Sequence, residues 1–331
     1  MTKEKTLRHD WTKEELLDIY NKPLMELVYE AATVHREWHK ADEVQISTLL
    51  SVKTGGCPED CSYCGQAARY HTDIKVQALL PTATVMAHAQ KAKERGASRF
   101  CMAAAWREVR DNRDFDRIID MVKGVNDLGL EVCCTLGMLS ESQAKRLQEA
   151  GLYAYNHNLD TSEEYYDEII STRKFDNRIN TINNVRKAGI TVCSGGIIGL
   201  GETHGDRVAM LRTLANMEIH PESVPVNALA RVKGTPLENN PKVDIWEMVR
   251  MIATARIAMP ASMVRLSAGR IEMTEADQAW CFMAGANSIF TGERETLLVT
   301  PNPGVSEDMQ MLLNLGLKPM VKERETVCSK S

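Results

Sequence analysis

Three cysteines stand close together in one short loop, at positions 57, 61 and 64, in the pattern C-x3-C-x2-C. Closely spaced thiolates are good ligands for iron or zinc. An iron–sulfur cubane normally takes four thiolates, so a loop that offers three leaves one iron with an open position. An open position is where a substrate or cosubstrate can bind. We therefore predict that Cys57, Cys61 and Cys64 hold a [4Fe–4S] cluster.

A structural zinc site is the alternative for the same loop. Such a site needs four ligands, usually as two separated pairs of cysteine or histidine. No second pair lies nearby, and His71, seven residues beyond Cys64, has no cysteine or histidine beside it. The pattern therefore favours a cluster with one open iron.

The loop resembles the cluster motif of the radical S-adenosylmethionine superfamily, in which an aromatic residue precedes the third cysteine, here Tyr63. In that superfamily the open iron chelates the amino and carboxylate groups of the methionine moiety. The resemblance therefore implies S-adenosylmethionine as a cofactor, with Tyr63 near its adenine. The usual Gly-Gly-Glu after the second strand is replaced here by Met-Ala-Ala-Ala-Trp at 102–106. The contact to the methionine amino group must therefore differ.

Composition and charge limit the remaining possibilities. The chain has 331 residues, of which 44% are hydrophobic and 26% charged, as in ordinary globular proteins. A formal net charge of -5 offers no basic surface for nucleic acid. No run approaches the about 18 apolar residues of a membrane span. Nine cysteines then indicate metal or redox chemistry in a reducing compartment. We expect a cytoplasmic protein without nucleic-acid or membrane partners.

Strand and helix patterns alternate from about residue 45, with a period of roughly 30 residues. The strand candidates are 45–52, 99–105, 130–136, 152–159, 191–199, 223–230, 264–269 and 288–290. The amphipathic segments between them are 82–95, 114–128, 140–150, 177–188, 205–217, 244–258 and 272–284. Glycines that follow four of these segments, Gly96, Gly129, Gly151 and Gly189, fit helix ends. Because parallel strands need crossover connections, this alternation predicts an α/β fold, a (β/α)8 barrel of the TIM type.

Further helices are predicted outside the barrel. Two of them fall within residues 11–39, where Thr12 and Glu15 fit a capping box. We expect residues 1–44 to form an N-terminal helical extension with a structural role. Residues 45–304 are expected to form the barrel, and 305–331 a C-terminal helix and tail.

The predicted barrel lumen gathers unusual side chains. Because side chains alternate along a strand, one set faces the lumen and the other faces the helices. In the second strand Phe100 and Met102 belong to the apolar set, which leaves Cys101 inside. The same pattern places Cys193 and Arg265 in the lumen. A lone buried cysteine is usually packing, but several beside a guanidinium suggest a second metal site.

The third predicted strand contains two neighbouring cysteines, and neighbours on a strand point to opposite faces. Cys134 shares its face with Val132 and Leu136, an apolar set suited to the helix layer. Cys133 shares its face with Glu131, in a mixed set suited to the lumen. We therefore predict that Cys133 faces the lumen and that Cys134 is a small buried hydrophobe.

Six stretches, from the cysteine loop to the last strands, resemble the biotin synthase family: 54–66, 100–106, 155–162, 192–202, 232–237 and 264–270. In that family three cysteines and an arginine bind an auxiliary [2Fe–2S] cluster, roles that fall on Cys101, Cys133, Cys193 and Arg265. The resemblance implies a sulfurtransferase that converts dethiobiotin to biotin. A deoxyadenosyl radical from S-adenosylmethionine abstracts hydrogen from an unactivated carbon, and the auxiliary cluster provides the sulfur.

The resemblance also assigns polar side chains at strand ends. Asn158 and Asp160 would contact S-adenosylmethionine, Asn158 would also meet the substrate, and Asn227 would hold the ureido ring. By residue type alone, each could instead be a helix cap. The substrate-carboxylate pocket would lie around 291–300, where a short insertion places Val299 at an expected threonine. The implied partners are a flavodoxin- or ferredoxin-type electron donor and a second copy of the chain in a homodimer.

Two other functions would share the cysteine loop. A related radical enzyme with another substrate would keep the cubane but lack the four lumen ligands. A non-catalytic carrier would close its cubane with a fourth cysteine. Cys281 and Cys328 match no family ligand, and the polar tail around Cys328 is expected to be disordered. The glycines of 195–201 lack the G-x-G-x-x-G pattern, so we expect close packing there rather than a dinucleotide.

Overall fold

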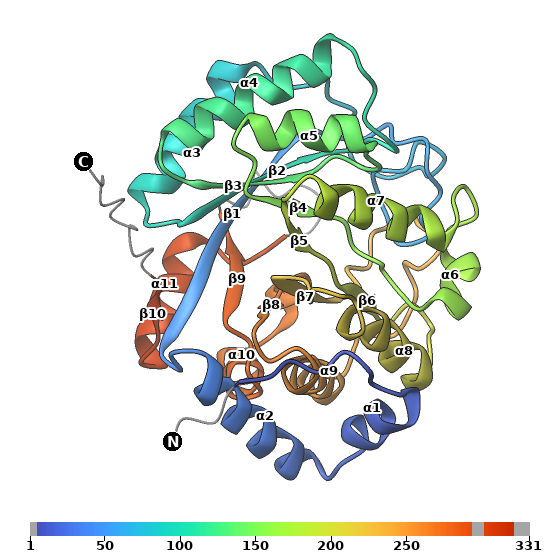
Figure 1. The fold of residues 1–331 in the computed structure, drawn as a ribbon, viewed down its shortest axis with the longest axis vertical. Coiled ribbons are helices and arrows are strands. Elements are labelled where there is room, and N and C mark those ends of the chain that lie inside the picture. The colour runs from blue at the N-terminus through green and yellow to red at the C-terminus, as the bar shows by residue number, and fades with distance from the viewer. Residues whose placement is uncertain (1–4, 293–300, 321–331) are drawn as a thin grey trace.

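The computed structural model describes residues 5–292 and 301–320, and its strands form a closed parallel barrel (Figure 1). The strands are β1 (Glu43–Lys53), β2 (Arg99–Ala104), β3 (Glu131–Thr135), β4 (Ala154–Asn156), β5 (Thr191–Cys193), β6 (Gly196–Ile198), β7 (Ser223–Ala228), β8 (Met263–Leu266), β9 (Ser288–Thr291) and β10 (Lys318–Pro319). Neighbours pair in the order β1-β2-β3-β4-β5-β7-β8-β9, and β1 pairs with β9 to close the ring. The predicted (β/α)8 barrel is confirmed.

Helices cover the outside of the barrel (Figure 1). They are α1 (Lys13–Tyr20), α2 (Leu24–Trp38), α3 (Thr82–Glu94), α4 (Arg113–Asp127), α5 (Glu141–Glu149), α6 (Glu163–Ile169), α7 (Phe175–Lys187), α8 (His204–Ala215), α9 (Ile245–Ala258), α10 (Glu275–Met283) and α11 (Val305–Asn314), with a 3-10 turn at Arg270–Glu272. The sequence patterns missed the short helix α6 and the outer strand β10, which pairs with β1. Within the described residues, no helix is long and apolar enough to cross a membrane.

The prediction of one strand over 191–199 is wrong, because the segment breaks into β5 and β6. At the break the Ser194 hydroxyl donates to the carbonyl oxygen of His157 at 2.9 Å. Gly195 lies so close to β7 that a Cβ atom there would be 2.0 Å from the carbonyl oxygen of Pro225. The expected close packing at a glycine is therefore confirmed, and the same approach explains the break.

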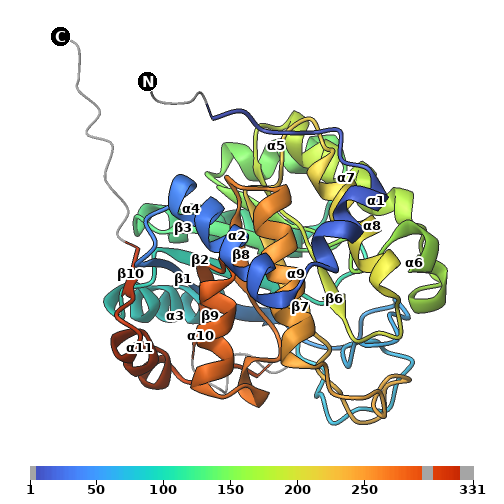
Figure 2. The same ribbon diagram turned by 90° about the horizontal axis from the view of Figure 1, so that it is seen from below.

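The N-terminal helices α1 and α2 lie outside the barrel, against α8 and α9 (Figure 2). The predicted capping box is present, because Thr12 accepts from the backbone N–H of Glu15 and the Glu15 carboxylate accepts from that of Thr12. The predicted C-terminal helix is α11, which Asn314 links to Glu275 on α10. The division of the chain at residues 44 and 304 stays a prediction.

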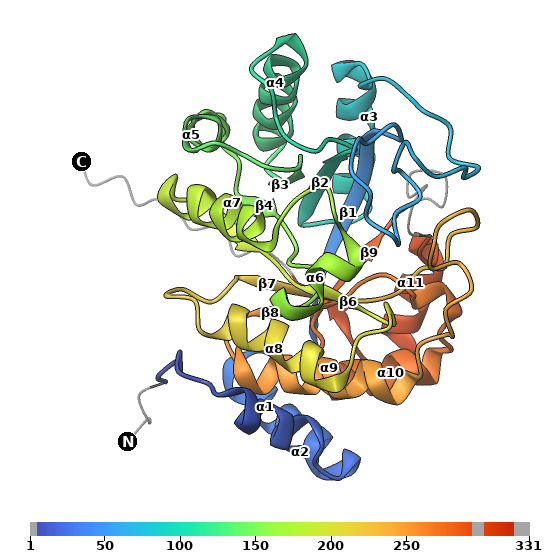
Figure 3. The same ribbon diagram turned by 90° about the vertical axis from the view of Figure 1, so that its right-hand side faces the viewer.

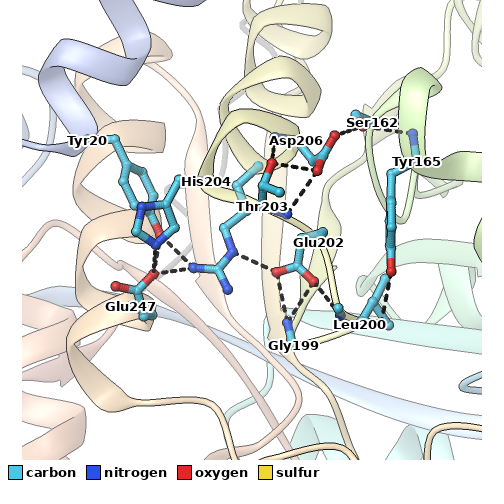
Figure 4. Close-up of polar contacts among 12 residues, drawn as sticks. Tyr20, Ser162, Tyr165, Gly199, Leu200, Glu202, Thr203, His204, Asp206 and Glu247 are labelled. Atoms are coloured by element: carbon cyan, nitrogen blue, oxygen red, sulfur yellow. Dashed lines mark hydrogen bonds and ion pairs between the residues drawn. The ribbon is translucent and has the colours of Figure 1, made fainter.

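Arg207 connects α1 to the turn that follows β6, and Figure 4 labels its partners Tyr20, Glu202 and Glu247. Its Nη1 donates to the Tyr20 hydroxyl at 2.9 Å and also to the Glu247 carboxylate. Its Nε donates to Glu202 at 2.6 Å, and Glu202 in turn accepts from the backbone N–H of Gly199 at 2.9 Å. The helical extension therefore braces a turn of the barrel.

Replacing Arg207 with methionine should lower the free energy of unfolding by about 3 kcal/mol, because it leaves a buried carboxylate without its cation. The Glu202 side chain is 1% exposed, so water cannot replace the guanidinium. Urea unfolding of the variant and the parent would measure the difference. Lys187→Met, which breaks a largely exposed pair with Glu141, is the matched control and should change stability by less than about 0.5 kcal/mol. Equal effects of both substitutions would contradict this prediction.

Candidate functional site

The three loop cysteines lie directly after β1, in a loop that folds back on itself. The N–H of Cys64 donates to the carbonyl of Cys61 at 2.9 Å, and the N–H of Cys57 donates to the carbonyl of Gln66 at 2.9 Å. These turns bring all three thiols to the wall of one cavity of about 190 Å3. The structure therefore gathers the predicted cluster ligands in one place.

A segment that follows α6 clamps this loop. Asp60 accepts hydrogen bonds from the backbone N–H groups of Ser171 at 3.0 Å and Thr172 at 3.1 Å. The N–H of Ser62 donates to the carbonyl of Ile169 at 3.0 Å. Burial opposes ionisation of Asp60, but the hydrogen bonds from Ser171 and Thr172 lower its pKa to about 2. A charged carboxylate thus holds the loop in place at neutral pH.

The thiols of the loop lie in a poorly hydrated environment. Burial raises the pKa of Cys61 to about 11 and that of Cys64 to about 12, and it also raises the pKa of Cys57. Metal binding must therefore displace protons from these thiols. Among the described residues, no three acidic, cysteine or histidine side chains converge on a single metal ion. A cubane does not need such convergence, because each thiolate binds a different iron. The donor set fits a cluster better than one ion.

Two of the predicted lumen cysteines face each other across neighbouring strands. Cys101 on β2 is the register partner of Cys133 on β3. Together with Ala154 they form a small buried cluster, separate from the main core that contains Cys134. A hydrogen bond from the Cys133 thiol lowers the pKa of Cys101. The predicted orientation of the adjacent cysteines is confirmed, and the role of Cys133 as a ligand stays a prediction.

Arg265 enters the lumen from β8 and is fully buried. Its Nη1 donates to the Cys193 sulfur at 3.6 Å, and its Nε donates to the Ser288 hydroxyl at 3.0 Å. The guanidinium also lies 4.4 Å from the ring centroid of Phe290. A [2Fe–2S] cluster needs two protein ligands for each iron. The Cys101–Cys133 pair and the adjacent Cys193–Arg265 pair fit that requirement.

The residues predicted to bind S-adenosylmethionine and substrate line a second cavity of about 280 Å3. Its wall includes Tyr63 and Cys64 from the loop, Asn158 and Asp160 beyond β4, and Asn227 on β7. Figure 3 shows the loop after β1 (blue) and the segment after β7 (gold) on the same side of the barrel. The structure therefore brings the predicted binding residues together beside Cys64, a predicted cluster ligand.

Asp160 is held by one cation, Arg178, and one neutral donor, the hydroxyl of Tyr63. The Tyr63 hydroxyl donates to its Oδ2 at 2.6 Å, and Arg178 of α7 forms an ion pair with the same oxygen. Asp160 has a φ of 71°, a left-handed conformation that aspartate adopts more readily than most residues. Sequence reasoning missed Arg178, because no local pattern relates it to the end of β4.

The helix-cap alternative is wrong for the three strand-end residues. The residue that caps α6 is Ser162, whose hydroxyl accepts from the N–H of Tyr165. The side-chain oxygen Oδ1 of Asn158 accepts from the N–H of Gly195 at 3.3 Å, between two strand ends. Asn227 donates to the carbonyl of Gly196 at 2.9 Å and accepts from Ala268 at 3.2 Å. These contacts orient both amides at the cavity wall.

Other predictions fall partly outside the structure. Residues 293–300, which include Val299, and the tail with Cys328 lie outside the described residues. The cavity of about 280 Å3 beside the cysteine loop is continued by one of about 930 Å3, which shares residues 228–230 of its wall and reaches Pro301. Cys281 is a residue of α10 whose side chain is buried in the main core, apart from the small cluster of Cys101, Cys133 and Ala154.

Known families match nearly the whole chain. The model of the radical SAM superfamily matches residues 51–214, and that of the biotin and thiamin synthesis associated domain matches 225–318. The chain is 66% identical over 313 residues to the biotin synthase of Cytophaga hutchinsonii, covering 95% of this chain and 92% of that protein. It is 60% identical over 327 residues to the biotin synthase of Nostoc punctiforme, covering 98% of each.

Solved structures agree on the fold. A crystal structure of methylornithine synthase has a TM-score of 0.81 at 18% identity and covers 94% of each chain. A maturase of the [FeFe]-hydrogenase has a TM-score of 0.79 at 20% identity, covering 94% of this chain and 72% of the maturase. At these identities the likeness shows the fold alone.

Proposed function

The chain belongs to the biotin synthase family of radical S-adenosylmethionine enzymes, and on this basis we propose a role for each residue of the site. It is a sulfurtransferase that converts dethiobiotin to biotin, with a [4Fe–4S] cluster, a [2Fe–2S] cluster and S-adenosylmethionine as its cofactors. The observation that best supports this function is the lumen set, in which Cys101 lies beside Cys133 and Arg265 contacts Cys193.

The proposed ligand sets divide between the loop and the lumen. Cys57, Cys61 and Cys64 hold the [4Fe–4S] cluster, and Cys101, Cys133, Cys193 and Arg265 hold the [2Fe–2S] cluster. When bound, these groups supply the reductive cleavage of S-adenosylmethionine and the sulfur atom, a chemistry that no side chain provides. The protein holds the reactants in place and keeps water away from them.

The cavity beside the loop binds and orients S-adenosylmethionine and the substrate. The Tyr63 hydroxyl and the Arg178 guanidinium both donate to Oδ2 of Asp160. No described residue hydrogen-bonds its Oδ1, which we assign to a ribose hydroxyl. The side-chain oxygen Oδ1 of Asn158 already accepts from the N–H of Gly195, so the side-chain nitrogen Nδ2 is the group that donates to the ligands. Asn227, fixed by two backbone contacts, presents its amide to the ureido ring.

Burial of the lumen side chains protects the reaction. Cys101, Cys133, Cys193 and Arg265 are each no more than 2% exposed. Water that reached this region could quench a reactive intermediate, and its exclusion also strengthens the attraction between thiolates and guanidinium. The lumen therefore suits hydrogen abstraction from an unactivated carbon.

Spectroscopic typing of the clusters, followed by an assay with dethiobiotin, tests the proposed function. We expect both cluster signatures in the reconstituted protein and biotin formation that requires dethiobiotin and S-adenosylmethionine. A single cubane with deoxyadenosine formation but no biotin would indicate a related radical enzyme. A cubane closed by a fourth cysteine would indicate a carrier.

Arg265→Lys should keep the [2Fe–2S] cluster and part of the activity. A guanidinium has no acceptor and is almost never deprotonated in proteins, which makes it an unusual ligand. A lysine ammonium would still offset the negative thiolates and sulfides. Absorption spectra and biotin yield measure the effect, with Arg265→Met as the variant that removes the charge. Complete loss of the [2Fe–2S] absorption in Arg265→Lys would show that the arginine is essential for assembly.

The partners follow from the same family membership. The reaction needs an external electron, for which we propose a flavodoxin- or ferredoxin-type donor. A homodimer is proposed as the assembly, and sedimentation equilibrium would test it. Thiolate ligands must stay reduced, which supports a cytoplasmic location.

A further inference from the structure

Arg173 is buried beside the cysteine loop with incomplete charge compensation. It lines the same cavity as the three loop cysteines, and its side chain is 7% exposed. Its Nη2 lies 4.0 Å from the Cys61 sulfur. Its Nε lies 3.8 Å from Oε1 of Glu59, and neither of these two atoms has a hydrogen-bond partner among the described residues. A buried donor with a positive charge is thus left without a full partner.

The carboxylate of Glu59, the nearest to Arg173, does not fully neutralise the positive charge of the cavity. Glu59 also lies 3.6 Å from Nε of Arg107, so one carboxylate faces two guanidinium groups. Arg178 differs, because it pairs with Asp160 and donates to the Tyr166 hydroxyl at 2.9 Å. Burying a charge is unfavourable unless it is paired and hydrogen-bonded. The remaining anion that Arg173 contacts is the thiolate that Cys61 becomes when it binds iron.

We propose that Arg173 is a positioning residue that donates to the Cys61 sulfur and raises the reduction potential of the [4Fe–4S] cluster. The proposal rests on the assignment of Cys57, Cys61 and Cys64 as ligands. Hydrogen bonds to cluster sulfurs and net charge are among the factors that set cluster potentials. A nearby cation favours the reduced state, because reduction adds negative charge to the cluster.

The fold fixes Arg173 in this place through the loop it serves. Asp60 binds the backbone of Ser171 and Thr172, the two residues that precede Arg173. The Thr172 hydroxyl also donates to Oδ1 of Asp60 at 2.8 Å. These hydrogen bonds hold the segment that carries Arg173 against the cysteine loop.

The test is a redox titration of the reconstituted holoenzyme, followed by electron paramagnetic resonance, in the absence of S-adenosylmethionine. For Arg173→Met we expect the ratio of reduced to oxidised cluster at the parent's midpoint to fall about tenfold, a shift of about 59 mV for one electron. Arg173→Lys keeps the charge and should shift the midpoint in the same direction by less. Arg69→Met is the matched control, because Arg69 pairs with Asp60 but is 57% exposed. Solvent screens that charge, so the parent's midpoint is expected.

Three results would overturn the proposal. One is the parent's midpoint in both Arg173 variants with the cluster assembled. Another is a shift that emerges only after S-adenosylmethionine is added, because Arg173 would then serve the methionine carboxylate. The third is failure of both variants to bind iron, which would show a purely structural role. If the [4Fe–4S] cluster fails to assemble only in Arg173→Met, the midpoint potential of Arg173→Lys decides, and the parent's value there would contradict the proposal. A wrong ligand assignment would give a different result, because the [4Fe–4S] cluster would then still assemble in Cys61→Ala.

Discussion

Cys61→Ala is expected to abolish both the [4Fe–4S] cluster and the formation of 5′-deoxyadenosine. The loop offers three thiolates, and Cys61 is the one most deeply enclosed, with its carbonyl forming the turn to Cys64. A cubane held by only two thiolates would have a second iron without a protein ligand, and solvent could reach that iron. Iron and sulfide content, absorption spectra and chromatography of deoxyadenosine measure the loss.

The auxiliary cluster should survive the same substitution. Its proposed ligands lie on β2, β3, β5 and β8, and none of them belongs to the loop. A separately reconstituted [2Fe–2S] spectrum should therefore stay recognisable in Cys61→Ala. Cys281→Ala is the control, because Cys281 is fully buried in the core and should cost about 1 kcal/mol of stability with both clusters intact. Deoxyadenosine formation that persists in Cys61→Ala would contradict the assignment of the loop.

The fold was predictable because its signals are local. The capping box at Thr12 and the glycines that end helices depend on neighbouring residues alone. Gly96 and Gly129 have φ values of 83° and 80°, the left-handed conformation typical of a helix end. The regular period of strands and helices then leaves few alternatives to a parallel barrel.

Contacts between distant segments were not predictable. The clamp between Asp60 and Ser171 joins residues 111 positions apart, and no periodicity relates the two. The ion pair between Asp160 and Arg178 likewise depends on how α7 packs over the barrel. The break between β5 and β6 arises from a close approach to Pro225 on another strand. Such contacts follow from tertiary packing, which can override local preference.

The sequence predicted which side chains of the candidate site face the lumen, but it did not show which of them bind iron. Alternation along regular strands correctly places Cys101 and Arg265 in the lumen, because β2 and β8 keep their pleat through these positions. It says nothing about which lumen groups bind iron, a role that came from the resemblance to a family. The sequence did not identify Arg173, because its proposed role depends on the burial of its charge, which residue type alone does not reveal.

Cys133→Ala should retain the cubane but lose the auxiliary cluster and biotin formation, whereas Cys134→Ala should keep both clusters. Cys133 lies opposite Cys101 in the register between β2 and β3, within the small lumen cluster. Cys134 lies opposite Met102 and packs in the main core, where alanine removes only a small buried group. The Cys134 substitution should lower the free energy of unfolding by about 1 kcal/mol.

The two variants control for each other, because they remove the same atom from neighbouring positions of one strand. Absorption of the [2Fe–2S] cluster, deoxyadenosine formation and biotin yield should be measured in both. Cys133→Ala should still form deoxyadenosine, since the cubane and its cavity are untouched, and this separates loss of the sulfur source from loss of radical formation. The reverse result, with the [2Fe–2S] cluster lost in Cys134→Ala and kept in Cys133→Ala, is incompatible with the pairing of Cys101 and Cys133. It would require a β-bulge that shifts every later side chain of β3 to the opposite face.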